Sequence, residues 1–594
     1  MIFLAVVAVV VVAALVVAAM GLGTNDGSSD DDSPSVMAIA DRDVFIGEKQ
    51  IIPLMTKNLN MATMIYSMED APTDATMTKE GIVYWIPKTP GTYEFRVVVN
   101  DTVLDPVSTG VKITVSADPV QKAPVVEPIA LGLALENVAI GYQVKAYDPN
   151  GDALTYSLSD GPEGVSISNT GMLVWTPDDS DVFTFDVEVS DGTASTSTTV
   201  TMTIVEKYDL VTRWNMEGAS YINSKMINNQ YGSRAMAMMH TAIFDAVNSI
   251  DPEYTAYNEL IDVNSSASQR AAVAAAAHRV LTTLYPADAA RFDALYDSQI
   301  ANMTDDQNRT DGIEVGIASA DAIIALRMND HASEANTVYV DKTEPGQYRK
   351  TGMMNPLMPG WGSVTPWSMT SGSQFRLSGP PQLTDDEYTM AYNETKSVGA
   401  RMSMMRTADQ SEDALFWIAG VPDHFYGVAR ELSARYDLDL EERARLFALL
   451  TITLADASIS GWDNKYNYTF WRPVTAIHDG ELDGNPSTVE DDTWMPFITT
   501  PAFPEYASGH STTCSAGATL LAEFFGTDDV TFVRMSATPG LPAHEYTSFS
   551  EIAEEAGASR IYAGVHFSFS NIEALENGAL IAEYAYLNQL RPES

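Results

Sequence analysis

The feature that most constrains the fold of this chain is an internal repeat with a constant offset of 90 residues. Aromatic and valine side chains alternate along both copies, which is the period of a half-buried β-strand. Each copy spans about 85–90 residues with turn signals at short intervals, as is typical of a small β-sandwich. We therefore predict two tandem all-β sandwiches, at residues 36–118 and 123–206. The matched pairs are Gly81 and Gly171, Trp85 and Trp175, Pro87 and Pro177, Tyr93 and Phe183, Phe95 and Phe185, Val97 and Val187, Val99 and Val189, and Asp101 and Asp191.

The chain changes character near residue 207. Segments such as 269–284 and 441–454 carry apolar residues at spacings of three and four, which is the period of an amphipathic helix. Residues 335–382 are rich in glycine, proline and tryptophan and are expected to form a long ordered loop or lid. The predicted fold class is therefore multidomain, with a large all-α helical-bundle domain at 207–594 after the two sandwiches.

Composition narrows the range of partners. The 594 residues are too many for one hydrophobic core, and 80 acidic against 34 basic residues give a formal net charge of −46. Such a chain has no basic surface to neutralise a phosphate backbone, so nucleic acid is excluded as a partner. The single cysteine, Cys514, cannot form an intramolecular disulfide and is expected to be a packed apolar residue.

The N-terminus has the composition of an export segment. No side chain from Met1 to Met20 is charged or polar, and this run is long enough to cross a hydrocarbon core of about 30 Å. A cleaved signal peptide usually begins with a basic region, but the first basic residue here is Arg42. We expect a signal or anchor helix at 1–22 and an acidic linker at 23–35, with membrane anchoring favoured over release. The protein would then be extracellular or at the cell surface.

The second sandwich contains an acidic turn sequence, Asp148-Pro149-Asn150-Gly151-Asp152. Its oxygen atoms could bind Ca²⁺. Proline, asparagine and glycine are equally the residues of a tight turn, and a turn without a metal is the favoured interpretation. The sandwiches themselves resemble the immunoglobulin-like and cadherin-like modules of exported proteins.

Three short clusters carry the chemistry of the helical region. They are Lys465-x6-Arg472-Pro473, Ser508-Gly509-His510 and Ser559-Arg560-x5-His566. Together they supply three cations, a hydroxyl, a backbone N–H beside a glycine, and two imidazoles. Two guanidinium groups and an ammonium can neutralise the oxygens of a tetrahedral oxyanion. One imidazole can bond the central atom and a second can move protons, so the set suits oxyanion chemistry.

Spacing predicts how the first two clusters are presented. Lys465 and Arg472 are seven residues apart, so they would share one face of a single helix, which Pro473 would end or kink. Ser508 and Gly509 should open a helix whose free N–H groups point at an anion.

The third cluster is expected at the end of another helix. Ser548-x-x-Glu551 resembles a capping box that starts this helix. Arg560 and His566 are six residues apart and could not face one ligand from a continuous helix, so we expect the helix to break at Gly564.

The three clusters resemble the signature of the vanadium-dependent haloperoxidases and the related type 2 phosphatidic acid phosphatases, a superfamily of helical bundles. All nine fixed positions of that signature occur here in order. The resemblance implies that His566 bonds the vanadium of a vanadate cofactor, or is the phosphohistidine nucleophile of a phosphatase. It implies that His510 is the acid–base residue, with Lys465 assisting it. The residues implied to hold the oxyanion are Lys465, Arg472, Ser508, Gly509, Arg560 and His566.

Two aromatic residues favour the haloperoxidase branch. Trp462 and Phe503 match positions that line the halide site in chloroperoxidase-type members, whereas bromoperoxidases tend to have a histidine in place of Phe503. One position departs from the family pattern, because the aspartate often found four residues after the last histidine is Ser570 here. The sequence therefore does not identify the group that orients the His566 imidazole.

The leading hypothesis is an exported vanadate-dependent haloperoxidase. It would oxidise halide with hydrogen peroxide to a hypohalous-acid-type species that halogenates an organic acceptor. The alternative on the same scaffold is an acid phosphatase with a phosphohistidine intermediate, in which phosphate takes the place of vanadate. A third hypothesis is a surface-binding protein whose helical domain is inert. A homodimer is compatible with all three. The other histidines are expected to be structural: His240, His278, His331, His424, His478 and His544.

Overall fold

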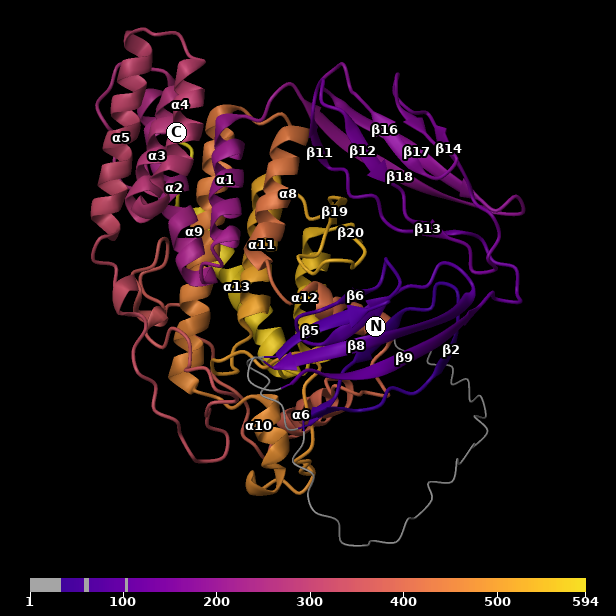
Figure 1. Cartoon of the computed structure of the whole chain (residues 1–594). Coiled ribbons are helices and arrows are strands. Elements are labelled where there is room, and N and C mark those ends of the chain that lie inside the picture. Colours follow the sequence, from indigo (N-terminus) through magenta and orange to yellow (C-terminus); the bar gives the residue numbers. More distant parts are fainter. Residues whose placement is uncertain (1–33, 58–63, 102–104, 594) are drawn as a thin grey trace, which may run out of the picture.

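The computed structural model describes residues 34–57, 64–101 and 105–593, so the expected signal or anchor helix at 1–22 and nearly all of the linker at 23–35 lie outside it. Strands run up to Val205 and helices begin at Leu210 (Figure 1). The predicted fold class, two β-sandwiches followed by a helical domain, is thus confirmed. One element departs from the all-α expectation, because β19 (Phe532–Arg534) and β20 (His544–Tyr546) form a hairpin within the helical domain.

The two sandwiches have the same strand order, as the repeat requires. Each has a four-stranded sheet, a three-stranded sheet and a short strand pair, and in each four-stranded sheet one edge pairing is parallel. In the first sandwich these are β2 (Arg42–Phe45), β9 (Val107–Ser116), β8 (Gly91–Asp101) and β5 (Met64–Glu69); β3 (Gln50–Pro53), β7 (Ile82–Trp85) and β6 (Thr76–Met77); and β1 (Ser35–Val36) with β4 (Thr56–Lys57). In the second they are β11 (Leu133–Leu135), β18 (Ser195–Val205), β17 (Val182–Ser190) and β14 (Thr155–Ser159); β12 (Ile140–Gln143), β16 (Met172–Trp175) and β15 (Ser166–Ile167); and β10 (Val125–Val126) with β13 (Ala146–Tyr147).

The residues that define the repeat form the two cores. Trp85 and Trp175 are both buried, and each packs edge-to-face on the aromatic ring eight residues later, with centroids 4.8 Å and 5.0 Å apart. The alternating phenylalanine and valines of β8 and β17 face inward beside them. Alternate side chains of a strand lie on one face, so the residues that alternate in the sequence are the ones that pack in the core.

The helical domain holds thirteen α-helices among its described residues. They are α1 (Leu210–Ser224), α2 (Asn229–Ile250), α3 (Gln269–Leu284), α4 (Ala289–Ala301), α5 (Gln307–Arg327), α6 (Asp386–Val398), α7 (Ala408–Phe416), α8 (Val421–Arg435), α9 (Leu440–Tyr468), α10 (Pro473–His478), α11 (Gly509–Phe525), α12 (Phe549–Tyr562) and α13 (Ser568–Asn588). Four short 3₁₀ segments are η1 (Pro286–Asp288), η2 (Ala332–Glu334), η3 (Trp361–Ser363) and η4 (Gly480–Leu482).

Two groups of helices pack on opposite parts of the long central helix α9. One group contains α1, α2, α3 and α5, and the other contains α8, α11, α12 and α13 (Figure 1). Within the described residues, α9 is the one helix long and apolar enough to cross a membrane, and 89% of its apolar window is buried inside the domain. Such burial is typical of the core helix of a bundle.

Glycines allow the helices of each group to approach closely. A Cβ at Gly316 of α5 would lie 2.4 Å from the carbonyl oxygen of Ala272 in α3. A Cβ at Gly578 of α13 would lie 2.3 Å from the carbonyl oxygen of Thr512 in α11. Backbones at this separation leave no room for a side chain, so glycine is required at both crossings.

The segment 335–382 is an ordered loop with one 3₁₀ turn, as expected. It is held by Asp456 of α9, a fully buried carboxylate that accepts hydrogen bonds from the backbone N–H groups of Trp367, Ser368 and Met369 at 2.7–3.1 Å. A buried carboxylate is stable only when its oxygens are paired, so Asp456 and the loop stabilise one another.

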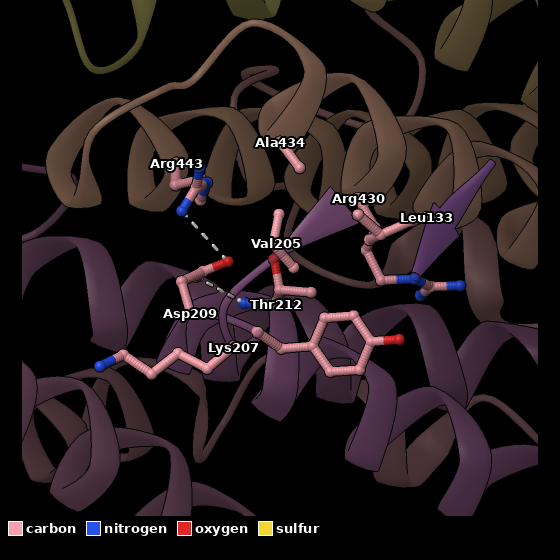
Figure 2. Close-up of a pocket in the computed structure, with 9 residues that line it drawn as sticks. Leu133, Val205, Lys207, Asp209, Thr212, Arg430, Ala434 and Arg443 are labelled. Carbon is pink, nitrogen blue, oxygen red and sulfur yellow. Dashed lines mark hydrogen bonds and ion pairs between the residues drawn. The ribbon is translucent and has the colours of Figure 1, made fainter. Parts of the chain in front are cut away.

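Both sandwiches dock on the helical domain. Arg401 is buried between that domain and the first sandwich and donates to the carbonyl oxygens of Leu54 at 3.0 Å and Glu80 at 2.8 Å. Figure 2 shows the junction with the second sandwich, where Asp209 caps α1 and pairs with Arg443 of α9 at 3.3 Å. The first sandwich is thus held on the bundle by the hydrogen bonds of a buried arginine, and Leu133 and Val205 of the second lie beside Arg430 and Ala434 of α8.

Candidate active site

Lys465 lies near the C-terminal end of α9 and is buried. Its ammonium donates to the carbonyl oxygens of Pro504, Glu505 and Ala507 at 3.1, 2.9 and 2.5 Å. These carbonyls belong to the segment before α11, so Lys465 joins the first cluster to the second. Burial and the charge of Arg472 hold the pKa of Lys465 well below its usual range.

Arg472 does not share a helix with Lys465, so that prediction is wrong. Helix α9 ends at Tyr468, and Thr469 takes a left-handed conformation with φ 49°. Arg472 is the N-cap of α10, and Pro473 starts that helix, where the missing N–H is not needed. A proline after an arginine can begin a helix as well as end one, and the spacing alone did not distinguish the two.

The Arg472 guanidinium nevertheless contacts the third cluster and the segment that precedes the second. Its Nε donates to the carbonyl oxygen of Phe503 at 2.8 Å, and its Nη1 donates to that of Val565 at 2.7 Å. Nη1 also lies 3.2 Å from Nε2 of His566. Its remaining nitrogen, Nη2, is buried and has no hydrogen-bond partner among the described residues.

The second cluster forms the N-terminus of α11, as predicted. Ser508 is the N-cap, and its Oγ accepts hydrogen bonds from the backbone N–H and hydroxyl of Ser511 at 3.4 and 2.8 Å. A Cβ at Gly509 would lie 3.6 Å from Cε of Lys465, so the main chain passes directly beside the ammonium-bearing side chain. His510 is half-buried, and its Nε2 is buried without a partner in the described part of the chain.

The third cluster lies where a helix ends, again as predicted. The Oγ of Ser548 accepts a hydrogen bond from Glu551 N at 3.1 Å and caps α12. The helix stops at Tyr562, and Gly564 turns the chain with φ 76°, so His566 lies in the connection to α13. The change of direction lets Arg560 and His566 approach one centre.

Arg560 is buried in the last turn of α12. Its Nη1 donates to the carbonyl oxygen of Trp417. Its Nε is buried and has no partner in the residues that the structure describes. Trp417, which the sequence did not indicate, therefore holds one arginine of the site through its main chain.

Glu505 orients the His566 imidazole. Its Oε1 lies 2.8 Å from Nδ1 of His566 and accepts a hydrogen bond from the backbone N–H of Phe567 at 3.0 Å. A proton on Nδ1 leaves the lone pair of Nε2 free, and that atom faces Arg472. The carboxylate expected at position 570 is thus supplied from another part of the chain. Sequence reasoning missed Glu505, whose one signal is an acidic residue three positions before Ser508.

The surroundings favour neutral imidazoles. Burial and the positive charges of Arg560, Lys465 and Arg472 hold the pKa values of His510 and His566 well below their usual range. A neutral imidazole has one nitrogen that accepts a proton or bonds an electrophile, which is the state that acid–base or nucleophilic chemistry needs.

Positive charge exceeds negative charge at this site. Burial lowers the pKa of Arg472 and of Arg560 to about 10, which still leaves both charged at neutral pH. Burial raises the pKa of Glu505, although Arg472 and Lys465 oppose that effect. Two charged guanidinium groups and the Lys465 side chain, which donates to three carbonyl oxygens, thus converge on one carboxylate, and an anion at the site would neutralise the excess.

We use the term cationic cluster for Lys465, Arg472, His510, Arg560 and His566. The donor set of the cationic cluster fits a tetrahedral oxyanion such as vanadate or phosphate. Within the cationic cluster, three buried atoms have no partner among the described residues: Nη2 of Arg472, Nε of Arg560 and Nε2 of His510. Buried polar atoms are almost always satisfied, so unpaired atoms from three segments indicate a ligand that these groups share.

Trp462 and Phe503 flank the cationic cluster. Their rings are 5.0 Å apart and inclined at 51°, and the ammonium of Lys465 lies 5.1 Å from the centroid of Phe503 and 6.0 Å from that of Trp462. The two residues assigned to the halide site by resemblance are therefore next to Lys465. Their role in halide binding stays a prediction.

The acidic sequence at 148–152 forms a tight turn, with Gly151 at φ 80° and Oδ1 of Asp148 accepting from the N–H groups of Asn150 and Asp152. The turn also brings carboxylate oxygens of Asp148, Asp152 and Asp191 within 4.8 Å of one another. Oδ2 of Asp148 is buried without a partner in the described chain. Calcium binding here stays a prediction.

The remaining histidines do not join the cationic cluster. Five of them pack in the fold or pair with single neighbours; these are His240, His278, His331, His424 and His478. His544 differs, because it lies in a group of acidic side chains with Glu412, Asp413 and Glu555.

The fold and the site define a class of protein: a helical domain built around an oxyanion site, with β-sandwich modules in front of it. Residues 445–591 match the family model of the VCPO second helical-bundle domain, and residues 123–205 match an Ig domain family model, He_PIG. The C-terminal region of this chain is therefore a helical domain of the vanadium haloperoxidase type, and an Ig-like module precedes it.

Individual proteins agree with this assignment. The chain is 27% identical over 365 residues to the vanadium chloroperoxidase of Curvularia inaequalis, covering 47% of this chain and 58% of that protein. It thus spans a little over half the length of that relative. Among solved structures, a bacterial vanadium-dependent iodoperoxidase matches with a TM-score of 0.57 at 22% identity, over 65% of this chain and 97% of that one. A bacterial vanadium-dependent chloroperoxidase matches with a TM-score of 0.50 at 16% identity, over 61% and 91%. These two show that the fold is shared.

Proposed function

We propose that the protein is a vanadate-dependent haloperoxidase that oxidises halide with hydrogen peroxide to a hypohalous-acid-type halogenating species. The observation that carries the proposal is the convergence of two unpaired guanidinium donors, from Arg472 and Arg560, and the unpaired Nε2 of His510 near the His566 imidazole. The helical domain is of the vanadium haloperoxidase type, which supports vanadate as the oxyanion.

The residues of the site have distinct roles in this proposal. Lys465, Arg472 and Arg560, with Ser508 and the Gly509 N–H, would bind the oxygens of vanadate, and Nε2 of His566 would bond the vanadium. When bound, vanadate supplies a Lewis acid that activates peroxide toward halide without a change of oxidation state. Glu505 keeps the proton of His566 on Nδ1, so the Nε2 lone pair is available for that bond.

His510 would move the protons. Burial and the neighbouring cations hold the pKa of its imidazole well below the usual range, so a neutral Nε2 would take a proton from hydrogen peroxide and return it to the leaving oxygen. Lys465 would assist by polarising the bound oxygens. Trp462 and Phe503 would form the apolar side on which halide approaches, because both rings lie beside the Lys465 ammonium.

Two assays on the full chain test the proposal. Halogenation of monochlorodimedone is measured with vanadate, peroxide and bromide or chloride, and hydrolysis of p-nitrophenyl phosphate is measured in parallel. We expect vanadate-dependent halogenation that is lost in His566→Ala and kept in the control His331→Ala, whose side chain is exposed and lies outside the site. Phosphate hydrolysis without halogenation would instead support the acid phosphatase. If the chain showed neither halogenation nor phosphate hydrolysis, the surface-binding hypothesis would be supported.

We further propose that the enzyme acts outside the cell, on an organic acceptor. The net charge of −46 suits an exported chain, and the Ig-like module is of the kind found on exported proteins. Fractionation of the producing cells, with halogenation measured in each fraction, tests this proposal.

A further inference from the structure

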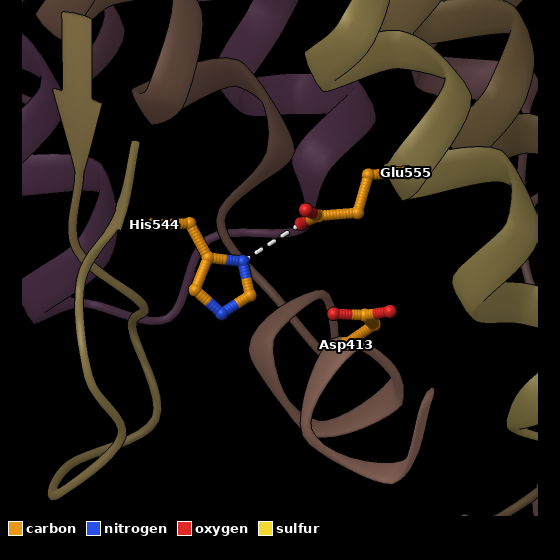
Figure 3. Close-up of side chains that lie close together, drawn as sticks. All are labelled: Asp413, His544 and Glu555. Atoms are coloured by element: carbon orange, nitrogen blue, oxygen red, sulfur yellow. Dashed lines mark hydrogen bonds and ion pairs between the residues drawn. The ribbon is translucent and has the colours of Figure 1, made fainter. Parts of the chain in front are cut away.

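A group of charged side chains lies where the first sandwich meets the helical domain. His544 of β20 faces Glu555 of α12 and Asp413 of α7, as Figure 3 shows. Its Nδ1 lies 2.9 Å from Oε1 of Glu555, and its Nε2 lies 3.6 Å from Oε1 of Glu412. The imidazole thus stands between two glutamates, and its ring stacks on Phe416 with centroids 4.0 Å apart.

Glu412 is the anchor of the first sandwich. Its Oε1 accepts a hydrogen bond from Nζ of Lys49 at 2.8 Å, and its Oε2 accepts one from the hydroxyl of Tyr84. Lys49 also donates to Asp409 at 2.6 Å. The side chain of Glu412 is only 6% exposed, so these contacts lie within the domain interface. Paired charges that are shielded from water are costly to separate, which makes the interface specific in orientation.

Glu555 extends the same network toward the active site. Its Oε1 accepts hydrogen bonds from the indole Nε1 of Trp417 at 2.8 Å and from the hydroxyl of Tyr546 at 2.7 Å. The Trp417 carbonyl in turn accepts a hydrogen bond from Nη1 of Arg560. One tryptophan therefore contacts the His544 network through its side chain and the cationic cluster through its main chain.

We propose that His544 is a positioning residue. It ties Glu412, on which the first sandwich docks, to Glu555, and so sets the position of Trp417 and of Arg560, which donates to the Trp417 carbonyl. The first sandwich would then be required for full affinity of the oxyanion site, although none of its described residues is part of the cationic cluster. This inference rests on the proposed function only in that the site binds an oxyanion.

The charge state of His544 agrees with this role. Burial alone would lower its pKa, but hydrogen bonds and charge from Glu412 and Glu555 outweigh burial and raise the pKa to about 9. Lys49, Asp413, Tyr84 and Tyr546 are the other titratable groups around these glutamates. The imidazolium is therefore charged at neutral pH, so it can donate a hydrogen bond to Glu555 and form an ion pair with Glu412 at the same time.

The test measures the Kd of the full chain for orthovanadate and for inorganic phosphate by isothermal titration calorimetry. His544→Gln removes the charge and one of the two donors, and we expect Kd to rise about five- to ten-fold. Lys49→Met removes the contact from the sandwich, and a rise of about three-fold is expected. Because both changes act through Glu412, the double variant should be no weaker in binding than His544→Gln alone.

Matched controls separate positioning from general destabilisation. His278→Gln removes another histidine–carboxylate pair, 2.7 Å from Asp293, and Lys112→Met removes a surface pair with Glu94 on the same sandwich. Neither should change Kd. Tyr84→Phe removes the second sandwich contact with little change of volume and serves if Lys49→Met does not fold.

The outcomes divide clearly. Variants that melt at a lower temperature but bind vanadate and phosphate as tightly as the wild type would show that the network is structural only and would overturn the inference. Equal changes of Kd in the control variants would do the same. Failure of the wild-type chain to bind either anion would overturn the proposed function, and the inference with it.

Discussion

Replacing Arg472 by lysine tests whether guanidinium geometry, and not only positive charge, builds the site. The guanidinium donates to the carbonyl oxygens of Phe503 and Val565 and approaches His566, and its Nη2 is buried and unpaired in the described chain. Lysine keeps the charge but has one nitrogen on a flexible stem, so it cannot reach all of these atoms.

The expected magnitudes follow from the hydrogen bonds that a lysine at position 472 cannot make. A hydrogen bond from a charged group is worth about 1.5–3 kcal/mol, and Arg472→Lys removes one or two bonds to buried carbonyls, so the free energy of unfolding should fall by about 1.5–6 kcal/mol. Without the Nη2 donor to the oxyanion, vanadate and phosphate binding should weaken by about 10- to 150-fold. Calorimetry gives both quantities, with binding measured well below the melting temperature of the variant.

Arg376→Lys is the matched control. Arg376 makes two hydrogen bonds to Asp463, at 2.7 and 2.8 Å, and its side chain is 37% exposed outside the site. An exposed pair contributes about 0–1 kcal/mol, so this variant should lose little stability and no anion affinity. If Arg472→Lys lost stability but kept the Kd of the wild type, Arg472 would be a structural tie between loops and the oxyanion site would lie elsewhere.

Other parts of the molecule lead to three further predictions. The folded-state pKa of His544 is raised to about 9, so the stability that its protonation gives the fold is complete below about pH 6.5 and is lost as the pH rises through 9. In the wild type the melting temperature should therefore fall between pH 6.5 and 9, and His544→Gln should make this fall smaller. An unchanged fall in the variant would contradict the assignment of the effect to His544. Gly578→Ala should cost about 1–3 kcal/mol, because the new Cβ overlaps the Thr512 carbonyl, whereas Gly110→Ala, with open space around it, should be neutral by denaturant titration. Calcium should raise the melting temperature of the chain in a buffer of high ionic strength, and Asp148→Asn should abolish that rise. If the variant showed the same rise, calcium would be acting by diffuse binding to the acidic surface.

The two β-sandwiches could be predicted from the sequence because their strands and turns are encoded by residues that are close together in the chain. The 90-residue offset carries strand positions, alternation and turns together, and the two sandwiches accordingly have the same sheets and equivalent core tryptophans. Helix ends were also readable where a residue has a local reason to be there, such as Ser508 at the start of α11 or Gly564 after α12. The Lys465–Arg472 spacing was misleading, because a period of seven says nothing about whether the helix continues.

The parts that could not be predicted depend on contacts between distant segments. Glu505 reaches His566 across 61 residues, and Trp417 reaches Arg560 across 143. An acidic residue in a short loop gives no sign that it will be buried, and a backbone carbonyl gives no sign in the sequence at all. Partners of a buried cation are therefore visible only in the structure.

The residues proposed to bind the oxyanion also hold the loops around the site. Lys465 donates to three carbonyls before α11, Arg472 donates to the carbonyls of Phe503 and Val565, and Arg560 donates to the carbonyl of Trp417. Because these bonds do not need a ligand, the site stays assembled without one, and changes at the three cations must affect stability and affinity together. His510 is different, since its Nε2 has no partner among the described residues. Its replacement by alanine should therefore separate the two properties: catalysis should be lost while the melting temperature changes little.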